Sequence, residues 1–418
     1  MLREASCDSG VATSGTLLSV EQALELLIER ALPVGEVETV EVIDALNRVV
    51  AEDVSSGVDV PATDNSSMDG YAVCSVEISD DKEYRLPVSQ RIAAGSCGAA
   101  LAPGTAARIF TGAPLPRGAD AVVMQERCAV HADGRVRIAG PVRPGDNVRR
   151  AGEDVRCGSV VLKKGTRLRA PEMGLAAAAG TARLPVFRRV RVALLSSGDE
   201  LAMPGGPLRP GQCFNSNHSV LTGLLRGLGC EVADGGWMPD EPAATRRALK
   251  RAAQASDLVL TSGGVSVGGE DHVRAAVEEL GHLDLWRVAI KPGKPIAFGR
   301  ISAAAFIGLP GNPVSAFVTF CLFVRPFVLR LQGMTEVTPR SFPVTAGFER
   351  RVAEKRREYL RARLTTVGGQ LYAEAYPHQG SGVLTSVAWA DGLVDVPPGE
   401  LVNRGYPVHF IPFSELLS

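Results

Sequence analysis

Short apolar runs alternate with helix-period patterns over the second half of the chain. The apolar runs 190–195 and 258–260 are typical of buried strands, and the amphipathic stretch 242–255 between them is typical of a helix. Alternating strands and helices predict a parallel sheet that is covered by helices on both faces. We therefore predict a three-layer α/β domain over residues 188–337.

The patterns at the two flanks of this domain are shorter and predict β-rich modules. Residues 51–150 carry short runs such as 70–73 and 121–124 between glycine, proline and aspartate turns, which predicts a small β-rich domain. Residues 338–418 show the same pattern and predict a C-terminal β-barrel. Residues 1–16 are small and polar, which indicates a disordered tail.

The remaining segments, residues 17–50 and 151–187, are expected to form a connecting region. A helix is predicted over residues 19–31, because Ser19 and Gln22 have the spacing of a capping box ahead of an apolar face. We expect this helix to pack on the α/β domain.

Composition excludes several classes of function. The chain has 418 residues with a formal net charge of -1 and 5% aromatic residues, so no nucleic-acid partner is expected. The eight cysteines include no Cys-x-x-Cys pair, which argues against zinc and indicates reduced thiols. No signal peptide is visible, and the apolar stretch 314–324 is too short to cross a membrane core that needs about 20 residues. We therefore expect a cytoplasmic protein with no membrane association.

Candidate chemistry gathers where the predicted strands end. The segment 261–271 follows the strand 258–260 and contains four glycines, Ser266 and Asp271. Parallel strands carry ligands at their carboxyl ends, and Gly263 and Gly264 would let the backbone approach a ligand closely. The segment has neither the P-loop pattern nor G-x-G-x-x-G. The sequence therefore predicts a ligand-binding loop of another kind.

Acidic residues follow two other strands. Asp199 and Glu200 could hold Mg²⁺ or could be an acid pair at a helix N-terminus. Asp240 could cap the helix that follows it, and for this residue taken alone capping is the favoured interpretation.

Two stretches predict anion binding. In Lys291-Pro-Gly-Lys294 a type II turn would hold two ammonium groups about 5–7 Å apart, which suggests an oxyanion between them, although a solvated basic turn is the alternative. Asn312 and Pro313 are typical of a helix N-cap and first helical residue, and that helix would aim free N–H groups at the strand end.

The ordered set of motifs resembles the molybdopterin molybdenumtransferase family, which includes MoeA proteins and the gephyrin E-domain. The matching segments are 64–73, 111–114, 118–123, 149–154, 197–201, 261–268, 291–295, 308–315 and 379–382, together with Asp240 and Asp271. The resemblance covers the chain from about residue 17 to its end.

The resemblance implies an enzyme that takes adenylylated molybdopterin and molybdate, inserts molybdenum into the dithiolene and releases AMP, with Mg²⁺ as activator. It also implies an elongated homodimer in which the α/β domain of one subunit and the β-rich domain of the other share a site. An adenylyltransferase and molybdoenzymes are expected as partners.

Individual residues carry over by position. The resemblance implies catalytic roles for Ser266, Asp271, Asp64, Glu200 and Asp240; pterin binding by Thr111, Arg149, Asp154, Gly263, Gly264, Pro310, Asn312 and Pro313; molybdate binding by Lys291, Lys294, Arg361 and Ser381; and Mg²⁺ binding by Glu200 and Asp271. Ser386 is an alternative to Ser381, and Arg287 stands where the family commonly has lysine, a change that matters because arginine binds as a planar fork.

Two other functions remain open at this point. A molybdopterin adenylyltransferase has a similar α/β domain, but such proteins are usually about one domain long. A non-catalytic scaffold, like the receptor-anchoring member of the family, could lose Lys291, Lys294 or Asp271, yet all three are present.

Overall fold

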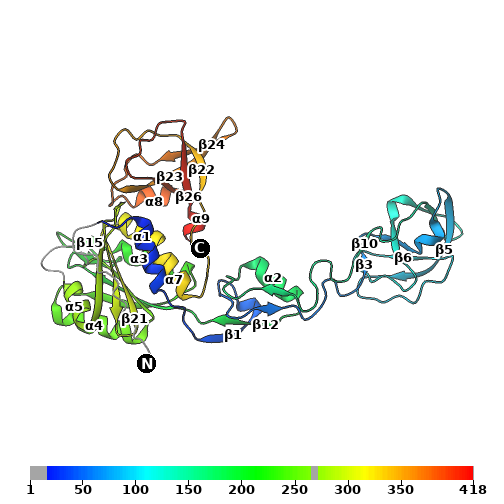
Figure 1. Ribbon diagram of the computed structural model, residues 1–418, viewed down its shortest axis with the longest axis horizontal. Helices are drawn as coiled ribbons and strands as arrows, with labels where there is room; N and C mark the ends of the chain where they lie inside the picture. The colour runs from blue at the N-terminus through cyan, green and yellow to red at the C-terminus, as the bar shows by residue number, and fades with distance from the viewer. Residues whose placement is uncertain (1–16, 265–271, 418) are drawn as a thin grey trace, which may run out of the picture. The chain divides into compact units, whose positions relative to one another are not determined.

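The computed structural model describes residues 17–264 and 272–417, so the tail predicted at residues 1–16 lies outside the described residues. The chain divides into two compact units (Figure 1). The first contains the described residues up to 38, residues 47–49 and the chain from 187 on; the second contains residues 39–46 and 50–186. Each unit is described separately.

A mixed sheet lies at the centre of the first unit. Its strands follow the order β16 (Glu231–Met238), β13 (Arg191–Ser197), β17 (Leu258–Ser262), β21 (Ala304–Leu309), β20 (Pro295–Ile301) and β18 (Gly281–Arg287). The first four strands are parallel, and the last two are antiparallel to their neighbours. The prediction of an all-parallel sheet is therefore corrected. Only Ser302 and Ala303 join β20 to β21, and so short a connection can link only antiparallel strands.

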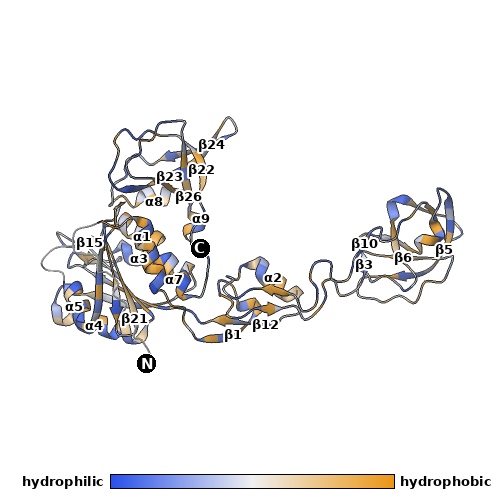
Figure 2. Ribbon diagram, in the orientation of Figure 1, coloured by the Kyte–Doolittle hydropathy of each residue, from blue (hydrophilic) through white to orange (hydrophobic). Residues whose placement is uncertain are grey.

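Helices cover both faces of this sheet, as the alternation predicts (Figure 1). One face packs against α4 (Pro242–Ala255) and α5 (His272–Leu280), with Leu195, Leu249 and Phe306 in the shared core. The other face packs against α3 (Ser216–Gly227) and α6 (Pro313–Thr319), and α1 (Val20–Arg30) packs on α7 (Arg325–Leu331). The predicted capping box of α1 is confirmed, and Figure 2 shows its ribbon alternating between hydrophobic and hydrophilic residues.

The apolar helix of this domain is longer than the sequence indicates. It runs from Pro313 to Leu331, is long and apolar enough to cross a membrane by composition, and is 94% buried inside the protein. Pro326 does not end it, because the preceding segment Phe320–Val324 is π-helical and its hydrogen bonds are already shifted. This burial is that of a core helix and is consistent with a soluble protein.

A closed barrel forms the end of the first unit. It contains β22 (Phe342–Ala346), β23 (Arg357–Val367), β24 (Gln370–Ala375), β25 (Gly392–Val396) and β26 (Pro407–Pro412), and closes because β23 pairs with both β24 and β25. The short helices α8 (Thr385–Trp389) and α9 (Phe413–Leu416) accompany it. Strand β19 (Ile290–Lys291) leaves the α/β domain and pairs in parallel with β23, which places Lys291 opposite Glu358.

The second unit is rich in β-structure. Its largest sheet has the order β7 (Ala121–Met124), β4 (Gly70–Val73), β6 (Ala106–Ile109), β5 (Glu83–Ile92), β9 (Arg135–Ala139) and β8 (Cys128–Val130). Strands β4 and β7 have the predicted bounds, and apolar side chains are buried on both faces of the sheet. The other paired segments are β1 (Val37–Glu41) with β12 (Arg183–Phe187), β2 (Val54–Ser55) with β11 (Val160–Leu162), and β3 (Asn65–Ser66) with β10 (Val148–Arg149). Helix α2 (Ala170–Ala178) packs near β11.

Candidate functional site

A cavity of about 780 Å³ lies at the carboxyl ends of β13, β17 and β21 in the first unit. This is the edge at which open α/β sheets bind ligands. Loops that follow these strands line the cavity, and residues 379–381 of the barrel close one side. The sequence-predicted residues that line it are Glu200, Asp240, Gly263, Gly264, Lys291, Lys294, Pro310, Asn312 and Ser381.

The loop after β17 requires glycine. Gly263 has φ +86°, and a Cβ there would lie 2.5 Å from the carbonyl oxygen of Ser197. Gly264 has φ +69°, and its Cβ would lie 2.5 Å from Cγ2 of Val273. Both positions therefore combine a left-handed backbone with close packing. The predicted residues Ser266 and Asp271 follow in the same segment and lie outside the described residues.

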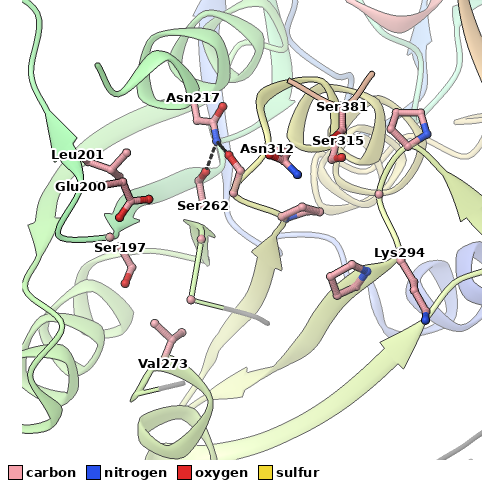
Figure 3. A pocket seen from close by; sticks show the side chains of 18 of the residues that line it. Ser197, Glu200, Leu201, Asn217, Ser262, Val273, Lys294, Asn312, Ser315 and Ser381 are labelled. Carbon is pink, nitrogen blue, oxygen red and sulfur yellow. Dashed lines mark hydrogen bonds between the residues drawn. The ribbon is translucent and has the colours of Figure 1, made fainter. Parts of the chain in front are cut away.

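Asn217 holds the ends of two strands together. Its Nδ2 donates hydrogen bonds to Ser262 Oγ and to the carbonyl oxygen of Gly311, both at 2.7 Å (Figure 3). The sequence suggests Asn217 as the cap of its helix, but Asn215 is the cap and accepts from the amide of His218. Two asparagines lie within three residues here, and only the tertiary contacts separate their roles.

The carboxylates lie on the β13 and β16 side of the cavity. The Glu200 carboxylate lies over Gly198, where an added Cβ would be 2.6 Å from Oε2. Asp240 does not cap α4, because Glu241 holds the N-cap position. The backbone amide of Asp240 donates a hydrogen bond to the Asp199 carboxylate at 3.3 Å. The carboxylate of Asp240 lies 3.9 Å from His272 Nε2.

The described residues contain no group of three metal-binding side chains. Mg²⁺, however, usually takes one or two carboxylates and completes its coordination with water and phosphate oxygens. Glu200 and Asp240 both line the cavity, so the carboxylates present fit this mode of Mg²⁺ binding.

The two lysines of the 291–294 segment have different surroundings. The Lys291–Pro292 peptide bond is cis, and Gly293 has the positive φ, +94°, that the sequence predicts for this position of the turn. The Lys291 ammonium lies 2.5 Å from Glu354 and 3.0 Å from Glu358, and these carboxylates compensate the charge that we expected to crowd Lys294. Burial lowers the pKa of Lys291, but the hydrogen bonds to both glutamates outweigh it and raise the pKa above its ordinary value.

Lys294 lines the cavity, and its side chain has no hydrogen-bond or ion-pair partner within residues 17–264 and 272–417. In the view of Figure 3, Lys294 and Glu200 lie on opposite sides, with Asn312, Ser315 and Ser381 labelled between them. The cavity thus presents carboxylates on one side and a cation on the other.

Arg361 supports the cavity wall from behind. Its side chain is 1% exposed, and its guanidinium donates to Ser386 Oγ at 3.0 Å and to the carbonyl oxygen of Gly380 at 3.3 Å. Burial lowers the pKa of Arg361 to about 10. Ser381 lines the cavity, whereas Ser386 is fully buried beneath it. The structure therefore brings Ser381, but not Arg361 or Ser386, to the cavity surface.

The helix that begins at Pro313 is tied to the barrel. Pro313 is in the first turn of α6 as predicted, and Asn312 holds the N-cap position without a capping hydrogen bond from its side chain. The amide of Val314 donates to the carbonyl oxygen of Ser381 at 2.9 Å. One of the N–H groups that we expected to be free is therefore used to position the 379–381 loop.

Four predicted site residues lie in the second unit. The Asp64 carboxylate accepts from the Ala151 amide at 2.8 Å and from Arg150 at 2.6 Å, and these bonds hold its pKa below the ordinary value. Thr111 Oγ1 donates to Asp69 at 2.7 Å. Arg149 lies on β10 beside Asn65, and Asp154 is exposed. The segments that carry these residues are neighbours. The amide of Leu115, four positions after Thr111, donates a hydrogen bond to the carbonyl oxygen of Asp64, and Arg149 pairs with Asn65, the next residue after Asp64.

Several lining residues were given no role by sequence reasoning. They are Ser197, Ser262, His272, Ser315, Arg356 and Gln379. Most lie within or beside the motifs at strand ends, so their position along the strands was a usable signal. Arg356 had none, since it is one of several charged residues in a polar segment.

Models of three protein-family regions match the chain. The MoeA N-terminal region (domain I and II) matches residues 18–180, a probable molybdopterin binding domain matches 193–330, and the MoeA C-terminal region (domain IV) matches 343–413.

Individual relatives match over nearly the whole length. The chain is 38% identical over 406 residues to the molybdopterin molybdenumtransferase of Haemophilus influenzae, covering 96% of this chain and 100% of that protein. It is 35% identical over 382 residues to that of Bacillus subtilis, covering 89% and 88%. The crystal structure of the molybdopterin biosynthesis moeA protein of Pyrococcus horikoshii OT3 is similar with a TM-score of 0.80 and 27% identity, covering 95% of this chain and 100% of that one.

Proposed function

The chain belongs to the MoeA family, and we propose on this premise that it is a molybdenum insertase. It transfers molybdenum from molybdate into adenylylated molybdopterin and releases AMP. Molybdate and the adenylylated pterin are its substrates. The alternatives, a molybdopterin adenylyltransferase or a scaffold, are not favoured, because the relatives that match over the full length are named molybdenumtransferases.

The charge distribution of the cavity supports this reaction best. Lys294 presents a cation to which a tetrahedral oxyanion can bind by charge-assisted hydrogen bonds. Gly263 and Gly264 expose backbone at the strand end, where a pterin or phosphate can approach. One cavity therefore suits both an oxyanion and a phosphorylated ligand.

Mg²⁺ is part of the proposal. Glu200 and Asp240 would hold it together with water and phosphate oxygens, and the bound ion would neutralise charge on the phosphoanhydride. Asp271 is expected to contribute from the segment outside the described residues.

A homodimer is also part of the proposal. Asp64, Thr111, Arg149 and Asp154 are polar groups of the second unit, and in a dimer one subunit's unit would complete the cavity of the other. We further propose a cytoplasmic location, with an adenylyltransferase supplying the substrate and molybdoenzymes receiving the product.

The decisive test is incubation of the purified protein with adenylylated molybdopterin, molybdate and Mg²⁺. We expect AMP release and cofactor formation together, both dependent on molybdate. AMP release that is equal with and without molybdate, or that occurs without cofactor formation, would show that the protein is not an insertase.

A further inference from the structure

Two carboxylates bind the Lys291 ammonium, and their surroundings differ. Glu358 has a side chain that is 3% exposed, and it also accepts two hydrogen bonds from Arg350, at 2.8 Å and 2.5 Å. Glu354 has a side chain that is 31% exposed, and its carboxylate contacts Lys291 Nζ at 2.5 Å. Glu358 is thus fixed by a buried network, whereas Glu354 depends on Lys291.

Strand pairing explains this difference. Lys291 lies directly opposite Glu358 in the β19–β23 ladder, so their contact is built into the sheet. Glu354 precedes β23, which begins at Arg357, and lies in an irregular segment. A small backbone or rotamer change can therefore move Glu354 away from Lys291 while the contact with Glu358 stays.

We propose that Glu354 is a built-in competitor for the oxyanion at Lys291, and thereby a residue that sets anion specificity. This inference rests on the proposed function, in which Lys291 and Lys294 bind molybdate. An ammonium has three donors, and the two glutamates use two of them. An incoming oxyanion that takes more than one donor must displace Glu354, the more exposed partner.

The competition favours dianions. Displacing a carboxylate costs an ion pair, which a dianion such as molybdate offsets through its larger charge, whereas a monoanion offsets less. Besides the hydrogen bond to Lys291, the charges of Arg356 and Arg350 also favour the ionised form of Glu354 and hold its pKa below the ordinary value. Glu354 would thus prevent chloride from binding at Lys291, whereas molybdate would displace Glu354 and bind there.

The test compares Glu354→Gln with Glu349→Gln. Glutamine keeps the shape and removes the charge; Glu349 lies in the same region but pairs with Arg351 at 2.7 Å, so its variant is a matched charge control. We expect Glu354→Gln to lower the KM for molybdate roughly two- to fivefold, the range that a partly exposed ion pair supports, with kcat little changed. Chloride should inhibit this variant more strongly than the wild type, and Glu349→Gln should match the wild type.

Equilibrium dialysis of molybdate alone against the same proteins gives a second measurement that needs no turnover. A lower dissociation constant for Glu354→Gln supports the competition. An unchanged or higher constant shows that Glu354 merely positions Lys291, and overturns it. If the wild type releases no AMP in response to molybdate, the proposed function fails, while the dialysis still decides whether Glu354 competes with the anion.

Discussion

Lys291 and Lys294 are only three positions apart in the sequence, but their side chains have different ion-pair partners. Lys294 has no side-chain partner in the described part of the chain, whereas Lys291 bridges two glutamates of the barrel. Lys294→Met should therefore raise the molybdate KM roughly ten- to a hundredfold, through loss of about 1–3 kcal/mol of charge-assisted binding, without changing the thermal unfolding midpoint. Steady-state kinetics and calorimetry measure the two effects.

The companion variant is Lys291→Met, which should impair molybdate binding and also lower the unfolding midpoint, because it leaves Glu354 and Glu358 with less compensating charge. Equal unfolding midpoints for the two variants would contradict the prediction that Lys291, unlike Lys294, contributes to stability.

Glu358 is the buried centre of the same network. Its carboxylate serves Lys291 and Arg350 at once, so Glu358→Gln leaves two cations with one fewer anion. Because Lys291 and Arg350 are each about one-third exposed, we expect a loss of roughly 1.5–3 kcal/mol in unfolding free energy, the range of hydrogen bonds to charged groups. Chemical denaturation measures it, with the exposed Glu374→Gln as control; a Glu358 variant as stable as this control would show that the network contributes little.

At the scale of elements, the loop after β17 depends on backbone conformation. Gly263→Ala should abolish most activity, because the added methyl meets the Ser197 carbonyl oxygen at 2.5 Å and the φ of +86° is strained for alanine. Gly206→Ala is the matched control, since no atom lies within 4 Å of its Cβ position. AMP release by the two variants is compared; an active Gly263 variant would mean that the loop can shift without loss.

Asp257 joins the amino ends of β13 and β17. Its carboxylate accepts hydrogen bonds from the two terminal guanidinium nitrogens of Arg188, at 2.7 and 2.8 Å, and from the backbone amide of Arg191 at 2.8 Å. Burial raises the pKa of Asp257, but these bonds lower it by more, so it lies below the ordinary value. Its contribution to stability is therefore present above the unfolded-state pKa of about 3.9 and is lost as pH falls through the folded-state pKa.

Asp257→Asn should accordingly cost about 2 kcal/mol at pH 7, and the difference from wild type should shrink below pH ~4. Thermal unfolding of both proteins across this range tests the expectation. A difference that stays constant down to pH 3 would mean that the charge of Asp257 is not what stabilises the strand ends.

Sequence periodicity predicted the elements of the α/β domain well, since α4 has the predicted bounds and the Ser19–Gln22 capping box is present. These features depend on residues close in sequence. The sequence did not predict that Lys291 pairs with Glu354 and Glu358, which are more than 60 positions away, or that Arg361 is buried behind the cavity. Such contacts follow from how the barrel packs, and local patterns carry no information about that.

At the scale of the whole molecule, the proposed dimer can be tested by complementation. Asp64 and Lys294 belong to different units, so inactive Asp64→Ala and Lys294→Ala subunits, when mixed and allowed to exchange, should regain part of the activity by forming one intact site. Light scattering checks the oligomeric state of each sample. Full activity in a monomeric wild-type protein would contradict the shared site.

The pairing of β19 with β23 also bears on how such a protein can evolve. A stand-alone α/β domain would keep the glycine loop and the carboxylates, but it would lose the ladder that sets Lys291 opposite Glu358. A lineage that lost the barrel would therefore keep the cavity-lining glycines and carboxylates but lose the contact that positions Lys291. Conversely, fusing a barrel to such a domain would both fix the position of Lys291 and supply Glu354 and Glu358, the carboxylates that pair with it. The strand pair is therefore the contact through which the barrel fixes the position of Lys291.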